Sequence, residues 1–123
     1  MIEREYVVHH IVMLTEYYED EGTSKRAPGF GLYFDGDLLK YFRITTKFDE
    51  KPEAIKRRYL EIFDYLEAGL KEKSWIDTVE IRAIYEERAA LQLVGALSDR
   101  DLERIKQYTL DVISGLNPAA REY

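Results

Sequence analysis

The sequence predicts a single α+β domain: a two-layer fold in which a five-stranded, mainly antiparallel sheet carries two helices on one face, in the order βββαββα. Two observations support this prediction. Five segments have the composition or the two-residue alternation of strands. Two others, residues 52–73 and 98–114, place apolar side chains at the three- and four-residue spacing of an amphipathic helix. A length of 123 residues suits one domain over residues 1–123.

Residues 4–15 predict the first strand. Three valines and an isoleucine favour a strand over a helix. Both faces of this strand are apolar, so it is expected at the centre of the sheet, covered on both sides, or at an interface with a partner. A helix that packs across the sheet is the alternative for this segment.

Residues 16–28 are predicted to form a mobile loop. This segment begins with an acidic and aromatic run and then becomes polar and basic. The end of the chain, residues 117–123, is predicted to be a tail, because Asn117-Pro118 stops the preceding helix.

A β-hairpin is predicted between these two regions, with strands at residues 30–34 and 38–48. The Asp-Gly pair at Gly36 separates two apolar runs, which is the sequence pattern typical of a tight hairpin turn. The face of the second strand that carries Phe42 and Ile44 is expected to point inward.

Residues 52–73 are predicted to form the central helix of the domain. Pro52 is tolerated in a first helical turn, and the acidic residues around it favour a helix start. Charge pairs along the helix are worth only about 0.2–0.5 kcal/mol each, so it would depend on packing for stability. Its apolar face would carry Ile55, Tyr59, Ile62, Phe63, Leu66 and Leu70.

The following region predicts two further strands. Residues 75–85 alternate, residues 86–88 form a turn, and residues 89–97 are almost wholly apolar, which is typical of a central strand. Gly95 marks a bulge or the close approach of a helix. In the alternating strand the inward side chains would be Val79, Ile81, Ala83 and Tyr85, and the outward ones Thr78, Glu80 and Arg82.

Residues 98–114 predict the last helix. Ser98 is a favourable N-cap, and Asp101 occupies the position of the acid in a capping box. Gly115 is placed for a C-terminal cap.

Composition restricts the function classes. The net charge is −6, and residues 1–24 hold six acids against one base. An acidic chain is a poor starting point for nonspecific nucleic-acid binding, although it does not exclude a local basic patch. The absence of cysteine excludes disulfides, thiolate zinc sites and iron–sulfur clusters. We expect no membrane span and no signal peptide, and therefore a cytoplasmic protein.

Candidate chemical sites are few. His9 and His10 are adjacent on a predicted strand and would point to opposite faces, so they would not share a metal ion. The acidic run at residues 16–21 lacks the spacing of a calcium loop. Phosphate-binding and nucleophile motifs are absent from the sequence. These observations predict no catalytic site, no metal and no cofactor, and they argue against an enzyme.

One compact basic cluster stands out. It lies near the start of the predicted central helix and could meet a phosphate or an acidic partner. The alternative is a solvated face that Glu53 and Glu61 already balance. The cluster consists of Lys47, Lys51, Lys56, Arg57 and Arg58.

The order and lengths of the last 75 residues resemble the type III secretion chaperone-like fold. The resemblance is carried by the helix at 52–73, the hairpin at 75–97 and the run Leu-Ser-Asp-Arg-Asp-Leu-Glu-Arg at 97–104. It implies a small acidic domain that dimerises and holds partner polypeptides on apolar surfaces. The chain departs from that fold at its front, where a strand replaces the opening helix. Roadblock and longin adaptor domains are a second fold-level analogy, with a less suitable strand distribution.

Together these observations predict a non-catalytic protein–protein interaction module, chaperone- or adaptor-like, that forms a homodimer and binds another protein. A nucleic-acid-associated protein that uses the basic cluster is the first alternative. A small-ligand or hydrolytic protein that uses His9 or His10 is the second. The ten tyrosines suit a surface that is both wet and adhesive. The expected partner-binding residues are Tyr6, Val8, His10, Val12, Tyr17 and Tyr18.

Overall fold

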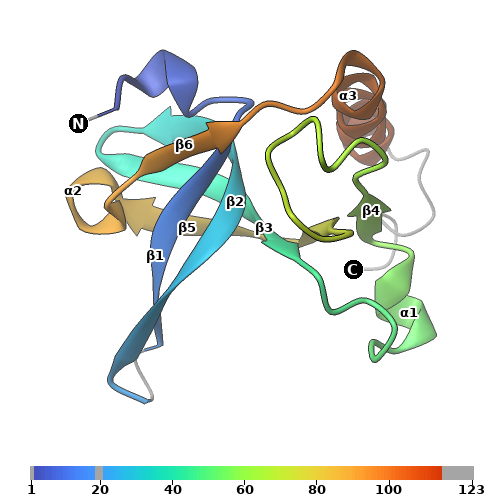
Figure 1. The fold of residues 1–123 in the computed structure, drawn as a ribbon, viewed down its shortest axis with the longest axis horizontal. Helices are drawn as coiled ribbons and strands as arrows, with labels where there is room; N and C mark the ends of the chain where they lie inside the picture. The colour runs from blue at the N-terminus through green and yellow to red at the C-terminus, as the bar shows by residue number, and fades with distance from the viewer. Residues whose placement is uncertain (1, 19–20, 115–123) are drawn as a thin grey trace.

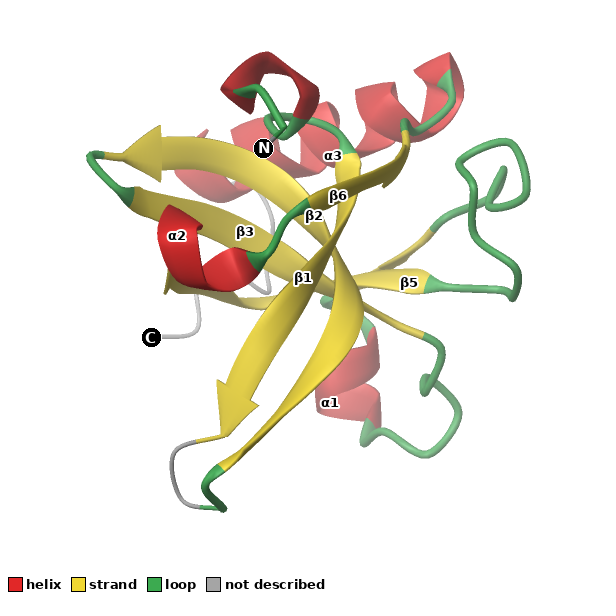
Figure 2. Cartoon of the chain, turned by 60° about the vertical axis from the view of Figure 1, so that its left-hand side comes forward, coloured by secondary structure: helices red, strands yellow, loops and turns green. Residues whose placement is uncertain are grey.

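The computed structural model describes residues 2–18 and 21–114, which form one twisted sheet with helices packed around it (Figures 1 and 2). In the described part of the chain the elements are η1 (Arg4–Tyr6), β1 (Ile11–Tyr18), β2 (Thr23–Asp35), β3 (Leu38–Thr45), α1 (Glu53–Lys56), β4 (Tyr59–Glu61), β5 (Trp75–Tyr85), α2 (Glu86–Ala89), β6 (Gln92–Gly95) and α3 (Asp99–Ser114).

The strands form one sheet in the order β4-β5-β3-β2-β1-β6, and every neighbouring pair is antiparallel. The predicted α+β class and antiparallel sheet are therefore confirmed. The described sheet has six strands where five were predicted, because residues 59–61 pair with β5 along the sheet edge.

Hydrophobic cores lie on both faces of the sheet. Tyr41 and Phe42 are neighbours on β3 and belong to different core clusters, so the two clusters lie on opposite faces. Ile105 of α3 packs into one cluster and Ala89 of α2 into the other. The prediction of helices on one face is wrong, since both faces of the central strands are apolar and each needs cover.

The strand predicted at residues 4–15 begins later, at Ile11, and a short 3-10 helix precedes it. Its doubly buried character is confirmed: Ile11 and Val12 are both fully buried and pack into opposite cores. The inward face predicted for Phe42 and Ile44 is also confirmed, with both side chains in the α3-side core.

The loop predicted at residues 16–28 is mostly strand. β1 continues to Tyr18 and β2 begins at Thr23, and the two pair antiparallel through Glu16↔Lys25 and Thr15↔Arg26. The two halves of the segment thus face each other across a hairpin, and their backbone groups are paired in the β1–β2 ladder. Residues 19–20 and the predicted tail at 117–123 lie outside the described residues.

The long helix predicted at residues 52–73 is absent, and only α1 is helical there. Ile62 and Ala68 are buried in the core, but Phe63 and Leu66 are exposed. Turns follow β4, and Gly69 adopts a φ of +89°, which ends any helical path. This segment has the apolar spacing of a helix, yet it pairs with β5 and buries side chains from its turns. Helix propensity is weaker than these tertiary interactions, so the helix does not form.

The inward face predicted for β5 is wrong. Val79, Ile81, Ala83 and Tyr85 are exposed, whereas Thr78 is only 5% exposed. The register of β5 against β3 shifts after Tyr41, whose partner is Arg82, while Arg43 pairs with Asp77. The Thr78 hydroxyl is satisfied inside by the Arg58 carbonyl and the Tyr108 hydroxyl. This bulge breaks the simple alternation on which the prediction depended.

Gly95 lies at a bulge, as predicted, because the β1–β6 register shifts between Ile11 and Val12. A Cβ at Gly95 would collide with the Ala68 carbonyl. The close neighbour is therefore the turn region after β4 rather than a helix.

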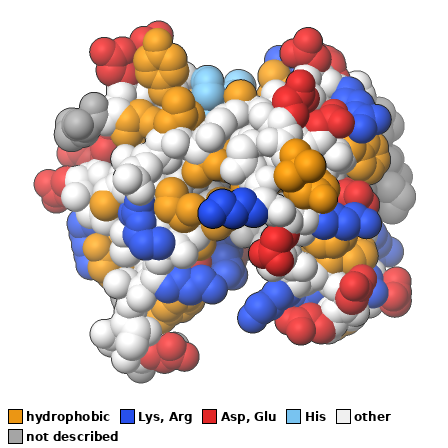
Figure 3. Space-filling view, in the orientation of Figure 1, with side chains coloured by type: hydrophobic (Ala, Val, Ile, Leu, Met, Phe, Trp, Pro, Cys, Tyr) orange, Lys and Arg blue, Asp and Glu red, His pale blue; other side chains and the backbone are white. Residues whose placement is uncertain are grey.

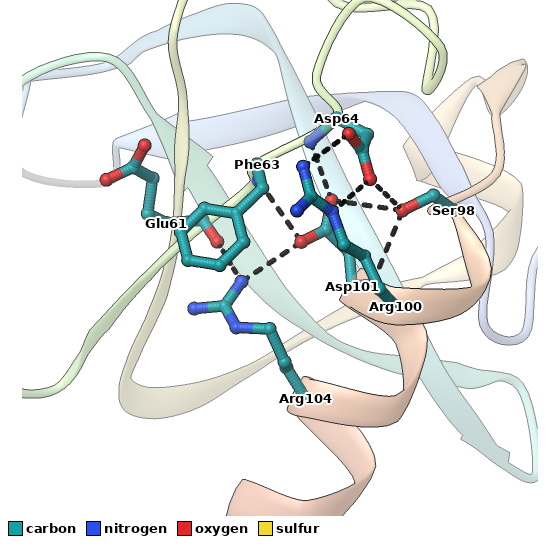
Figure 4. Close-up of polar contacts among 7 residues, drawn as sticks. All are labelled: Glu61, Phe63, Asp64, Ser98, Arg100, Asp101 and Arg104. Atoms are coloured by element: carbon teal, nitrogen blue, oxygen red, sulfur yellow. Dashed lines mark hydrogen bonds and ion pairs between the residues drawn. The ribbon is translucent and has the colours of Figure 1, made fainter.

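Ser98 caps α3 as predicted, since its Oγ accepts the N–H of Asp101 at 3.3 Å. The Asp101 carboxylate does not complete a reciprocal capping box. It reaches the turn after β4 instead, where it accepts the N–H groups of Phe63 and Asp64 at 3.1 and 2.8 Å (Figure 4). The start of α3 is thereby tied to the segment that replaced the predicted central helix.

Asp64 joins the same network. Arg100 donates two hydrogen bonds to its carboxylate, at 2.7 and 2.8 Å, and Ser98 donates a third at 2.6 Å. The hydrogen bonds from Arg100 and then from Ser98 lower the pKa of Asp64 from 3.8 to about 2. A depressed folded-state pKa means that this carboxylate stabilises the fold above about pH 4 and that the stabilisation is lost as the pH falls to about 2.

We therefore expect the wild-type protein to lose more stability between pH 5 and pH 2.5 than an Asp64→Asn variant does, because the variant has no charge to protonate. Urea unfolding at the two pH values measures the difference. Glu103→Gln, on the exposed surface of α3, serves as the control and should follow the wild type. An equal pH dependence of Asp64→Asn and wild type would contradict the prediction.

Candidate nucleic-acid interface

The predicted basic cluster follows the end of β3 and surrounds α1. Lys47 and Arg57 are exposed, and Lys51 and Lys56 are half-buried. Arg58 departs from the cluster, because its guanidinium turns inward, where Nη2 lies 3.4 Å from the Thr78 carbonyl oxygen. The structure thus leaves four of the five predicted cations at the surface of one segment.

Aromatic side chains accompany these cations. The rings of Phe48 and Trp75 stack with centroids 4.7 Å apart and nearly parallel planes. Lys56 Nζ lies 5.1 Å from the centre of the Phe48 ring, and Lys73 Nζ lies 5.6 Å from that of Trp75. Tyr59 extends the group, with its ring 6.2 Å from Phe48. Trp75 is only 8% exposed, so its ring supports Phe48 and is not itself open to solvent. We call Lys47, Phe48, Lys51, Lys56, Tyr59 and Lys73 the basic–aromatic surface.

Sequence reasoning found three lysines of this surface and missed Phe48, Lys73 and Trp75 as functional candidates. These residues come from the loop after β3 and from the start of β5, and only the sheet brings them together. A mixture of cations and aromatic rings is the composition that proteins use to hold single-stranded nucleic acid.

A hollow separates the lobe that ends in the β1–β2 hairpin from the lobe that carries α1, and Lys and Arg side chains lie on both of its sides (Figure 3). On the hairpin, Lys25 and Arg26 are exposed. Arg26 is held in place by hydrogen bonds from its guanidinium to Thr15 Oγ1, the Ala89 carbonyl and Gln92 Oε1, each at 3.0 Å. These bonds direct Arg26 toward α2 and β6, so it is the other Lys and Arg side chains seen in Figure 3 that concentrate positive charge at the hollow of a chain that is acidic overall.

A buried carboxylate lies on β1. Glu16 is 2% exposed, its Oε1 lies 3.2 Å from Arg43 Nε, and its Oε2 accepts the Tyr18 hydroxyl at 3.2 Å. Burial, and then the Glu16 charge, raise the pKa of Tyr41 beside it. Burial and the same charge raise the pKa of Tyr18. Both phenols are therefore neutral donors at physiological pH.

Arg43 connects this carboxylate to the basic–aromatic surface. It lies opposite Asp77 on β5, and Asp77 lies opposite Tyr59 on β4. The Tyr59 hydroxyl donates to Asp77 Oδ2 at 3.2 Å, and burial followed by the Asp77 charge raises the pKa of Tyr59. A row of polar residues thus crosses the sheet from Glu16 to Tyr59, in which Arg43 and Asp77 are neighbours by strand register.

The six predicted partner-binding residues fall into three places. Tyr6, Val8 and His10 come together before β1, where the His10 ring lies 6.2 Å from Tyr6 and its Nδ1 lies 2.9 Å from the Val8 carbonyl oxygen. Val12 is buried in the core. Tyr17 and Tyr18 lie at the far end of β1. The structure therefore does not gather these residues into one surface.

The two histidines are separated by the backbone. His9 has a φ of +60° and an exposed side chain, and its ring stacks on Phe30 with centroids 6.1 Å apart. His10 faces Tyr6 instead. Within residues 2–18 and 21–114, no three His, Asp or Glu side chains are grouped so that they could hold a metal ion.

No family model matches the chain, and no curated protein sequence is significantly similar to it. Its fold is shared with chains of solved MazE-MazF structures.

One such chain comes from a crystal structure of MazE-MazF (Form-II) from Deinococcus radiodurans, with a TM-score of 0.63 and 11% identity over 89% of this chain and 96% of that one. A second comes from Form-III of the same complex, with a TM-score of 0.61 and 13% identity over 88% and 94%. Identities this low establish the fold alone.

The resemblance to type III secretion chaperones, and the analogy with roadblock and longin domains, are therefore wrong. Both depended on the helix at residues 52–73, which the structure replaces with α1, β4 and turns. The non-catalytic chaperone- or adaptor-like module predicted from them is overturned by the same finding. No helix within the described residues has the length and hydropathy of a membrane span.

Proposed function

We propose that this chain acts on RNA and binds it as a single strand along the basic–aromatic surface. The observation that carries the proposal is the combination of Lys47, Lys56 and Lys73 with the Phe48–Trp75 stack on a MazF-like fold. MazF-type proteins have an endoribonuclease fold, which favours a nucleic-acid-acting protein.

Lysine and aromatic side chains would contribute to RNA binding in different ways. Lysines neutralise backbone phosphates and release condensed counterions, which makes binding salt-dependent. Aromatic faces stack on bases without regard to sequence and contribute about 1–3 kcal/mol per base. Two of these lysines have acidic neighbours: Lys56 lies 3.4 Å from Glu53 and Lys73 lies 3.7 Å from Glu61. Such surface ion pairs are worth only about 0–1 kcal/mol, so a phosphate can replace the carboxylates. Screening limits the reach of the more distant acids to about 10 Å, although the net charge is −6.

The test is fluorescence anisotropy with labelled single- and double-stranded RNA at two salt concentrations. We expect the wild type to bind single strands and to weaken as salt rises. The double variant Lys47→Gln/Lys56→Gln should reduce the salt dependence by about 1.4 in log–log slope, since each phosphate contact on a single strand contributes about 0.7.

The matched control is Lys40→Gln/Lys106→Gln, which removes the same charge from β3 and α3, away from the basic–aromatic surface. It should keep the wild-type slope. Absence of salt-sensitive binding to any RNA, or an equal loss in the control, would refute the proposal.

A second candidate function is cleavage of the bound RNA, and the endoribonuclease fold of MazF-type proteins favours it. An end-labelled single strand incubated with the protein should yield discrete shorter products on a denaturing gel. RNA that stays intact at saturating protein concentration would remove this candidate and leave binding untouched.

The neighbouring structures are complexes of MazF with a partner protein, MazE. For this chain a protein partner, and the expected homodimer, remain proposals. Light scattering at micromolar concentration measures self-association, and a monomer mass would exclude the homodimer.

A further inference from the structure

A small cavity lies beside the row of polar residues that crosses the sheet. Its volume is about 230 Å³, below the range of roughly 300–1,000 Å³ typical of pockets for drug-sized ligands, so it suits a single ring system. β1, β3, β5 and α2 contribute its walls. The side chains that matter for its chemistry are Glu16, Tyr17, Tyr41, Arg82, Tyr85 and Arg88.

Glu16 provides unused acceptor capacity in this cavity. Its Oε1 forms an ion pair with Arg43, yet it accepts no hydrogen bond from any described residue. An ionised carboxylate has about four acceptor positions, and the Tyr18 hydroxyl occupies one of those on Oε2. A buried acceptor without a hydrogen bond is costly, so a donor at this position would gain free energy. Glu16 is 2% exposed and its Oε1 lies against Arg43, so a ligand would reach this oxygen by displacing the Arg43 side chain.

The walls are suited to a flat ring. Tyr17 and Tyr85 are half-exposed at the mouth, and Tyr41 is buried inside. The Arg88 guanidinium lies 4.3 Å from the centre of the Tyr17 ring, and the Tyr17 hydroxyl donates to the Arg88 carbonyl at 3.1 Å. Arg82 and Arg88 add positive charge beside the carboxylate, where carbonyl and phosphate oxygens would be attracted.

The hydrogen-bonding groups of the four RNA bases differ, and these differences determine which base the cavity suits. Guanine presents two adjacent donors, N1–H and the 2-amino group, in the parallel arrangement that matches the two oxygens of a carboxylate. Adenine and cytosine each place an acceptor nitrogen beside their amino group, and uracil places its single N–H between two carbonyls. These acceptors would be repelled by Glu16.

We propose that this cavity reads a guanine base of the bound RNA, with the Glu16 carboxylate accepting from N1–H and the 2-amino group. The inference rests on the proposed function, because the RNA strand would bring the base to the cavity. Arg43 contacts Glu16, its neighbour in the sheet is Asp77, and Asp77 accepts the Tyr59 hydroxyl, so a row of residues leads from the cavity to the basic–aromatic surface.

The experiment compares oligouridine strands that carry one central guanine, adenine, cytosine or inosine. We expect the wild type to prefer guanine about 10- to 100-fold, since a bidentate pair discriminates by about 1–3 kcal/mol. Inosine lacks the 2-amino group and should lose most of this preference. Glu16→Gln keeps the size of the side chain but replaces one acceptor with a donor, so it should bind all four strands within about threefold.

Inosine tests the inference in the unaltered protein, so it remains decisive even if Glu16→Gln fails to fold. A second arm titrates guanosine monophosphate against inosine and adenosine monophosphates, with the aromatic resonances of the tyrosines observed by NMR. Strands that bind without base preference, or a guanine preference that survives in Glu16→Gln, would overturn the inference and leave the proposed function standing. Selective guanosine monophosphate binding without strand binding would reject the proposed function and reduce the inference to a free-nucleotide site, and failure of both arms would reject both.

Discussion

Replacing Asp101 with alanine is expected to lower the free energy of unfolding by about 3–5 kcal/mol, the cost of breaking a buried, hydrogen-bonded charge pair. Asp101 is 3% exposed, and Arg104 Nη1 lies 3.0 Å from its Oδ1. Its carboxylate also accepts the N–H groups of Phe63 and Asp64. Alanine would leave two backbone donors without their acceptor and remove the carboxylate partner of Arg104, whose Nη1 still donates to the Glu61 carbonyl at 2.6 Å. Urea unfolding followed by tryptophan fluorescence measures the loss, since Trp75 lies in β5.

The matched control is Asp99→Ala in the first turn of the same helix, where the aspartate is exposed. It removes the same helix-dipole interaction, worth about 0.3–1 kcal/mol, without removing a buried acceptor. Asp101→Asn should fall between the two, because an amide oxygen can accept one of the two N–H groups. A loss for Asp101→Ala no larger than that for Asp99→Ala would show that the network in Figure 4 does not hold α3 to the turn.

The second large effect is expected at Gly31, where alanine should destabilise the protein by about 3 kcal/mol or more, at the upper end of overpacking. A Cβ there would collide with the Val7 carbonyl oxygen and lie 2.9 Å from its carbonyl carbon. The same segment is hydrogen-bonded to Gly31 on both sides, through the His9 N–H and the His10 carbonyl. The residues before β1 would have to move away from β2, and the buried Val7 would move with them.

The Gly36→Ala variant serves as a control that distinguishes the destabilisation due to a steric collision from that due to backbone strain. Gly36 has a φ of +58° but open space around its Cβ position, so alanine there should cost only about 1–2 kcal/mol from the left-handed conformation. Both variants are compared with wild type by urea unfolding at one pH. Equal losses at the two glycines would contradict the packing explanation for Gly31.

The RNA proposals depend on residues that are far apart in the sequence. Phe48 and Trp75 stack although 26 residues separate them in the sequence. Glu16 and Arg43 meet across the sheet in the same way. Mutations at Asp101 or Gly31 should therefore weaken RNA binding only as far as they unfold the domain, whereas Lys47, Lys56 and Glu16 variants should change binding in a folded protein.

The sequence alone determined the class and several local features, because these depend on neighbours along the chain. The β-branched run at Ile11 and Val12 identified a strand buried on both faces. The Asp-Gly turn at Gly36 located the β2–β3 hairpin, and Ser98 marked the start of α3. The basic segment from Lys47 onward was also visible as a candidate site.

Only the tertiary structure decided the segment at residues 52–73 and the site. Its apolar spacing suits a helix, yet edge pairing of Tyr59 with β5 and burial of Ile62 stabilise a strand and turns instead. The bulge in β5 reversed the face on which Thr78 lies, and no local pattern encodes a register shift of that kind. Glu16 looked like part of a solvated acidic loop, and only pairing with β2 and contact with Arg43 placed its carboxylate in the interior. Such outcomes depend on contacts between distant residues, whose free energies exceed the local preferences that a single sequence expresses.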